Sequence, residues 1–269
     1  MNEPGLIVLY DIPSKLESRC WSINMWKARL VLNYKGLPYR TEWISYPDVE
    51  PTFKKLGIPP SMKKNYNDQD HYTCPSIIDY TVTPEAKVTE SLAIAQYLDD
   101  KYSSEEKYGP RLFPEGTKDA QLAFYAKFVD GIGYNVVALC LGSVPAIIED
   151  PRGAEYFEAS REKMKGRPLS QFFAAGSSER KEAWDALREG LNELAMAYDK
   201  NEEGRGEYLF GKNITFADMV VVAAFLWARI TPVDRDGPES KYVWDTVKTW
   251  NGGRWERLVE KFEKYLHIK

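Results

Sequence analysis

The sequence predicts an α/β domain followed by an all-α helical domain. Strand and helix signals alternate over the first hundred residues, and every strong signal in the second half of the chain is helical. Between them, residues 103–116 are polar and rich in proline and glycine, as linkers are. The 269 residues suffice for two domains of ordinary size, which we place at residues 1–103 and 115–269.

The first domain is expected to follow the order β-α-β-α-β-β-α. Residues 6–12 (LIVLYDI) are apolar, β-branched and aromatic, which predicts a buried strand. A helix is expected over residues 24–36, because Trp26 and Leu30 share one face and Gly36 suits its C-terminal end. Similar patterns predict a strand at 38–46, a short helix at 47–57, a surface loop at 58–71, a hairpin at 73–90 and a helix at 91–102.

The second domain is expected to contain one central, buried helix. Residues 216–230 follow Thr215, which with Asp218 makes a T-x-x-D pattern typical of a capping box. This helix is apolar almost all round, so other helices should surround it. Those helices are predicted at 118–141, with bends at Gly131 and Gly133, and at 155–165, 177–200 and 254–267.

Charge and composition exclude several classes of partner. The 36 basic and 40 acidic residues are interleaved and give a net charge of −4, so no nucleic-acid partner is expected. The longest apolar run, residues 219–228, is far too short to span a bilayer, so no membrane partner is expected either. The first residues lack a signal-peptide pattern, and the three widely spaced cysteines are typical of reduced thiols in a cytoplasmic protein.

Two histidines, His71 and His267, are too few for most zinc sites, and we expect no bound metal. A Ser-His-Asp triad is disfavoured for the same reason, and no glycine-rich phosphate-binding motif occurs. An enzyme with this sequence is therefore expected to take its chemistry from a bound cosubstrate.

The loop before the first helix offers one candidate site. Ser22 precedes the helix, where unpaired backbone N–H groups favour a negative charge. A hydroxyl there can donate a hydrogen bond to a thiolate or an oxyanion, and Asn24 is a second candidate donor. The simpler alternative is that Ser22 only caps the helix.

Two further segments complete the candidate site. Cys74 and Pro75 open the predicted third strand of the domain, which is the first strand of the hairpin. A proline there leaves the Cys74 backbone available to a peptide-like ligand. Glu90 and Ser91 begin a helix and could bind the ammonium and carboxylate groups of an amino acid. The alternatives are an ordinary trans proline at a sheet edge and a plain helix cap.

Taken in this order, the three segments resemble the glutathione transferase family, and the resemblance covers nearly the whole chain. It implies a thioredoxin-like N-terminal domain, a cis peptide bond before Pro75, and a Glu90-Ser91 pair that holds the γ-glutamyl end of glutathione. The segment TFADMVVVAAF resembles the capping box and central helix of the family's helical domain.

The same resemblance decides between Ser22 and Cys20. Family members with an active-site cysteine carry C-P-[FWY]-x-x-[KR]-x-x-[LV], and Ser22 has Lys27 five positions on and Leu30 eight positions on. Cys20 lies out of this register. The segment WSINMWKARL is also similar to bacterial β-etherases and to etherase-related fungal transferases (Fu A- or Xi-like), although Ile23 replaces their proline.

The resemblance implies a detoxifying enzyme in which a serine-stabilised glutathione thiolate attacks hydrophobic or aromatic electrophiles, with β-etherase-like activity among the options. It implies a homodimer. Glutathione is expected to contact Cys74, Pro75, Glu90, Ser91 and His71, with Lys63 or Lys64 nearby; the electrophile is expected to contact Phe124, Phe128 and Tyr134.

Three alternatives stay open. Cys20 could form a mixed disulfide with glutathione, as in a thioltransferase or deglutathionylating reductase. The protein could instead carry aromatic ligands without turnover, as a ligandin. A scaffold that has lost its site is the third, and the intact Glu90-Ser91 and Cys74-Pro75 pairs argue against it.

Overall fold

The structure is a computed structural model that describes residues 5–63, 68–201, 205–232 and 241–269. Lys64 lies outside these ranges. Contacts divide the chain into two compact units, which we describe separately. The first contains Met1–Gly109, Ile147–Met164 and Tyr265–Lys269; the second contains Pro110–Ala146 and Lys165–Lys264.

The first unit is built on a four-stranded mixed sheet. Its strands, in order across the sheet, are β2 (Tyr39–Trp43), β1 (Ile7–Asp11), β5 (Ser76–Asp79) and β6 (Ala86–Thr89). β1 runs parallel to β2 and antiparallel to β5, and β5 pairs antiparallel with β6. Every residue of β1 is buried, as its apolar sequence predicts. The segment expected as a loop contains a further two-stranded hairpin, β3 (Met62–Lys63) with β4 (Asp70–His71).

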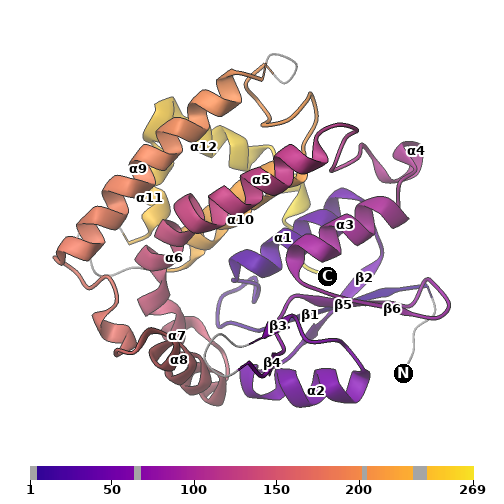
Figure 1. Cartoon of the computed structure of the whole chain (residues 1–269), viewed down its shortest axis with the longest axis horizontal. Coiled ribbons are helices and arrows are strands. Elements are labelled where there is room, and N and C mark those ends of the chain that lie inside the picture. Colours follow the sequence, from indigo (N-terminus) through magenta and orange to yellow (C-terminus); the bar gives the residue numbers. More distant parts are fainter. Residues whose placement is uncertain (1–4, 64–67, 202–204, 233–240) are drawn as a thin grey trace. The chain divides into compact units, whose positions relative to one another are not determined.

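Helices cover both faces of this sheet (Figure 1). α1 (Ile23–Tyr34) and α3 (Ser91–Lys101) lie on one face, and α2 (Val49–Leu56) lies on the other. The unit also contains the single turn α4 (Glu105–Tyr108), helix α8 (Pro151–Lys165) and a 3-10 turn at Tyr46–Asp48. α1 packs beside α3, and a buried ion pair of 2.7 Å between Lys35 and Asp99 joins them. α2 covers the opposite face, where Val49 and Phe53 pack against Val8 of β1.

The second unit is helical, with α10 (Phe216–Ile230) buried from Phe216 to Ala228. The predicted capping box is present: the Asp218 carboxylate accepts hydrogen bonds from the Thr215 N–H at 2.8 Å and from its hydroxyl at 2.7 Å. The other helices are α5 (Lys118–Phe128), α6 (Tyr134–Cys140), α7 (Val144–Ile147), α9 (Ser178–Asp199), α11 (Val243–Val247) and α12 (Trp250–Glu260), with 3-10 turns at Leu141–Ser143, Leu169–Gln171 and Glu263–Tyr265.

The predicted bend of the first long helix is a π-helical turn, Val129–Gly133, which joins α5 to α6. By length and composition alone, the helical run Lys118–Ile147 would also be able to cross a membrane. A core helix of a soluble protein meets the same criterion.

Candidate functional site

Ser22 occupies the position just before α1, and its backbone is extended, with φ −70° and ψ 137°. Within the described chain its side chain makes no capping hydrogen bond to the helix, although serine is a common cap. The residue is half-buried, and the first turn of α1 contains no acidic residue. The hydroxyl and the first N–H groups of α1 therefore remain available to an anion. Asn24, in that first turn, is exposed.

Cys20 lies only two residues earlier in a very different environment. Its side chain is fully buried beside Asp11 and Arg29. Burial, and then the charge of Asp11, raise the pKa of the Cys20 thiol well above its ordinary value. Arg29 opposes this shift without overcoming it. A thiol in this position stays protonated and out of contact with solvent.

The charged groups around Cys20 form a buried pair that joins α1 to the sheet. Arg29 contacts the Asp11 carboxylate at 2.8 Å, and both side chains are inaccessible to solvent. Arg29 also donates to the Thr41 hydroxyl at 3.0 Å. These bonds fix the first helix against β1 and β2 beneath the Ser22 loop.

The predicted glutathione-binding segments come together in the first unit. The peptide bond between Cys74 and Pro75 is cis. The Glu90 N–H donates to the Pro75 carbonyl at 3.3 Å, and the Thr73 hydroxyl donates to the Glu90 carboxylate at 3.3 Å. Ser91 follows as the first residue of α3 and is buried. Two segments fifteen residues apart in sequence thus share one corner of the sheet.

Glu90 has a strained backbone, with φ 76° and ψ 127°. A non-glycine residue in a sparsely populated region costs about 1–3 kcal/mol, and such residues cluster at ligand sites. Hydrogen bonds on both sides of Glu90 hold this conformation: its N–H bonds Pro75, and its carbonyl accepts from the Ile94 N–H at 2.8 Å.

His71 ends β4, and its carbonyl accepts from the Ser61 N–H at 2.8 Å. It borders a pocket of about 250 Å³ in the first unit. The rings of Tyr46 and Tyr156 stack on one side of this pocket, 6.0 Å apart and 16° from parallel. Burial raises the pKa of Tyr46 to about 12. The full lining is Tyr46, Pro47, Glu50, Pro51, Lys54, His71, Tyr72 and Tyr156.

The three aromatic residues predicted to meet the electrophile belong to the second unit. Phe128 is 3% exposed and packs against Phe124, with ring centroids 5.7 Å apart, so it is a core residue. Tyr134 is 45% exposed and lies edge-on to Phe173. The side chains of Phe124 and Tyr134 are therefore accessible enough to contact a ligand, whereas that of Phe128 is not.

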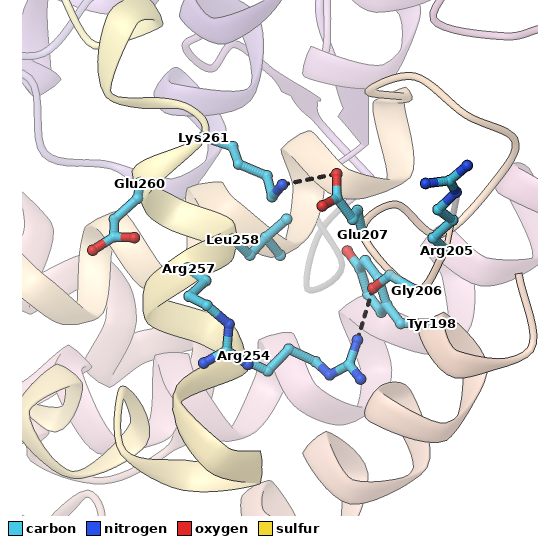
Figure 2. A pocket seen from close by; sticks show the side chains of 9 residues that line it. All are labelled: Tyr198, Arg205, Gly206, Glu207, Arg254, Arg257, Leu258, Glu260 and Lys261. Carbon is cyan, nitrogen blue, oxygen red and sulfur yellow. Dashed lines mark hydrogen bonds and ion pairs between the residues drawn. The ribbon is translucent and has the colours of Figure 1, made fainter. Parts of the chain in front are cut away.

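A second pocket, of about 530 Å³, lies in the helical unit beside α12 (Figure 2). Among the described residues, four basic and two acidic side chains line it, and none of the predicted site residues does. Two of its cations have partners: Arg254 donates to the Gly206 carbonyl at 2.8 Å, and Lys261 pairs with Glu207 at 2.9 Å. The residues predicted to bind glutathione therefore lie in the first unit and not at this pocket.

Metal ligands are not gathered anywhere in the described part of the chain: no three or more His, Cys, Asp or Glu side chains form a possible metal site there.

Two family models match the sequence. One, described as glutathione S-transferase, N-terminal domain, matches residues 18–107. The other, described as glutathione S-transferase, C-terminal domain, matches residues 120–265, which is more than half of the chain. The chain belongs to the glutathione S-transferase family. Its thioredoxin-like domain and helical domain are confirmed as the architecture of this family.

Fungal glutathione transferases of known structure are similar over the whole chain. Glutathione transferase GSTFuA3 from Phanerochaete chrysosporium is 36% identical, with a TM-score of 0.86 and coverage of 100% of both chains. A glutathione S-transferase of Ceriporiopsis subvermispora, solved in complex with glutathione, is 31% identical, with a TM-score of 0.85 and 98% coverage of each chain. The glutathione S-transferase-like protein ustS of Aspergillus flavus is 29% identical over 273 residues, covering 94% of each chain.

The sequence did not indicate two features of the first unit. Thr73 joins a cluster of hydroxyls in which its Oγ1 lies 2.5 Å from Ser61 Oγ, and only its position beside Cys74 hinted at a role. Tyr46 and Tyr156 are 110 residues apart, and nothing in the sequence signals that α8 packs in the first unit.

Proposed function

We propose that this transferase binds glutathione and uses the Ser22 hydroxyl to stabilise the thiolate for attack on hydrophobic or aromatic electrophiles. The observation that carries the proposal is the position of Ser22 at the start of α1, with a side chain that does not cap the helix in the described chain. The glutathione complex of the Ceriporiopsis subvermispora relative supports the choice of cosubstrate.

These groups can supply the free energy that is needed to stabilise the glutathione thiolate. A free cysteine thiol has a pKa of about 8.5, and lowering that pKa by about two units takes about 2.7 kcal/mol of preference for the anion. One charge-assisted hydrogen bond supplies about 1.5–3 kcal/mol. The N-terminus of α1 adds about 0.3–1 kcal/mol. Ser22 therefore does not need to lose its proton, and Asn24 is a second candidate donor.

The tripeptide would extend from Ser22 toward α3. In this arrangement the Cys74 backbone bonds the peptide, and Glu90 and Ser91 bind the ammonium and carboxylate groups of the γ-glutamyl residue. The strained backbone of Glu90 supports this assignment, because strain of this kind is typical of ligand clamps. His71 is the proposed contact at the edge of the site.

In the reaction, the thiolate sulfur forms a bond to an electrophilic carbon and the leaving group departs with the electron pair of its own bond. The thiol proton goes to solvent. With an aryl ether the leaving group is a phenolate, as in a β-etherase. The resemblance of the segment around Ser22 to etherase-related transferases supports this subtype.

Chemistry at Cys20 is the less favoured alternative. A thioltransferase needs an accessible thiolate, whereas Cys20 is buried and has a raised pKa.

Binding of aromatic ligands without turnover is favoured by one observation, the pocket walled by Tyr46, Tyr72 and Tyr156. Quenching of tryptophan fluorescence by polyphenols, compared between the native protein and Tyr156→Ala, tests this function. Weaker binding to the variant is expected, and equal binding would remove the pocket from consideration.

We further propose a cytoplasmic homodimer. Cys20, Cys74 and Cys140 are free thiols, which suits a reducing compartment. Light scattering during size-exclusion chromatography should give twice the mass of 30.9 kDa.

Ser22→Ala is the direct test of the mechanism. Turnover with 1-chloro-2,4-dinitrobenzene should fall by about tenfold or more, since one charge-assisted hydrogen bond is lost, while glutathione still binds. Cys20→Ser is the matched control and should keep most activity. If Cys20→Ser abolishes turnover and Ser22→Ala does not, the assignment is wrong.

A further inference from the structure

We propose that Trp21 is a positioning residue for Ser22, and that α8 of the first unit supports it. This inference rests on the proposed function, because it concerns how the Ser22 hydroxyl is aimed.

Trp21 anchors the turn that enters α1. It directly precedes Ser22 and is 3% exposed. Its indole N–H donates to the carbonyl of Ile12, just beyond β1, at 3.1 Å. This bond spans nine residues and closes the loop between β1 and α1 at its end nearest Ser22.

The ring of Trp21 packs edge-on against Phe157 of α8, with centroids 6.2 Å apart and an angle of 74°. Phe157 is itself buried, and its ring contacts Tyr46 at 5.6 Å and the guanidinium of Arg161 at 4.3 Å. The indole is therefore held by a hydrogen bond on one side and by a fixed aromatic ring on another.

The rest of the loop is tied to the segment that leads into α8. The Lys15 N–H donates to the Ile147 carbonyl at 2.8 Å. Arg19 pairs with Glu149 at 3.0 Å, and Ser14 and Ile148 form a single β-bridge. The Cys20 side chain, buried beside Asp11 and Arg29, and the Trp21 indole hold the last part of the loop, and of these two residues Trp21 is the one directly next to Ser22.

Positioning matters here because a hydrogen bond weakens steeply as its angle and length depart from the optimum. A small displacement of the Ser22 backbone would leave glutathione bound through its γ-glutamyl end and its backbone, while the thiolate loses stabilisation. A merely structural role for Trp21 would lower the melting temperature without changing the titration of the bound thiol.

Trp21→Phe tests the proposal, because phenylalanine keeps a ring and removes the N–H donor. The pKa of bound glutathione is read from thiolate absorbance at 240 nm as pH is varied. We expect this pKa to rise by about half a unit to one unit, which corresponds to losing about 0.7–1.4 kcal/mol, a part of the charge-assisted hydrogen bond from Ser22. At pH values well below the pKa of the native bound thiol, kcat should fall by about three- to tenfold, with little change in KM for glutathione, and it should recover at high pH.

Two further variants make the result decisive. Phe157→Leu removes the supporting ring and should shift the same pKa in the same direction, which keeps the test available if Trp21→Phe fails to fold. Trp244→Phe, a buried tryptophan of the second unit, is the control and should leave the pKa unchanged. If folded Trp21→Phe, or Phe157→Leu in its place, titrates like the native protein, the inference is wrong even when Ser22→Ala shifts the pKa. If Ser22→Ala itself causes no shift, the proposed function fails.

Discussion

At the residue scale, Cys20 and Ser22 are only two positions apart in sequence but lie in environments that suit different chemistry. The Cys20 side chain is buried against the Asp11–Arg29 pair, and Ser22 lies at the start of α1. The more nucleophilic atom is therefore the less available one. The proposed enzyme takes its sulfur from glutathione and contributes a hydroxyl.

The burial of Cys20 predicts its reactivity. Iodoacetamide at pH 8 should leave Cys20 unmodified, because the raised pKa keeps the group as a thiol until well above that pH. Burial and the charge of Asp11 also raise the pKa of the Cys74 thiol, but Cys74 is only half-buried and should therefore react before Cys20. Mass spectrometry of tryptic peptides measures both rates, and alkylation of native Cys20 as fast as free glutathione would contradict the assigned environment.

The choice of Ser22 over Cys20 came from the resemblance to the family's motif, with Lys27 five and Leu30 eight positions after Ser22, and a local motif of this kind can be read from sequence. The burial of Cys20 could not be predicted in the same way. It depends on Asp11 and Arg29, which come from different elements and meet only in the folded sheet. Likewise, nothing in the sequence indicates the positive φ of Glu90.

At the scale of elements, α10 organises the second unit through its N-terminus. The Asp218 carboxylate is fully buried and, besides both groups of Thr215, accepts bonds from the Tyr198 hydroxyl at 2.8 Å and the Leu209 N–H at 2.8 Å. A single side chain thus connects α10 to α9 and to the chain between them. The sequence predicted the capping box but not these two additional partners.

Asp218→Ala should lower the free energy of unfolding by about 3 kcal/mol or more, because each buried donor left unpaired costs about 1–3 kcal/mol. Asp245→Ala is a matched control, since Asp245 belongs to a capping box at α11 but is exposed. Its loss should cost less than about 1 kcal/mol. Urea denaturation measures both values, and equal costs would show that burial of the first box is unimportant.

At the scale of the whole molecule, the order of elements could be predicted because apolar runs and helix ends are local signals. The assignment of segments to units could not. Ile147–Met164 was expected in the helical domain at 115–269, yet its contacts place it in the first unit, through ion pairs and aromatic stacking that join residues over a hundred positions apart.

Glutathione should stabilise the folded protein as any ligand of the native state does. At about one hundred times its Kd the gain is about 2.7 kcal/mol, which raises the melting temperature measurably. S-methylglutathione keeps the γ-glutamyl end and should give a similar shift. Glu90→Gln should reduce both shifts, and an unchanged response in that variant would remove the amino-acid contact assigned to Glu90.

The proposed mechanism depends most on where the sulfur of glutathione lies relative to Ser22. A crystal structure of the protein with glutathione measures this directly. We expect the sulfur within hydrogen-bonding distance of Ser22 Oγ, with the γ-glutamyl group at Glu90 and Ser91. A sulfur beyond the reach of that hydroxyl, or bonded to Cys20 instead, would contradict the account.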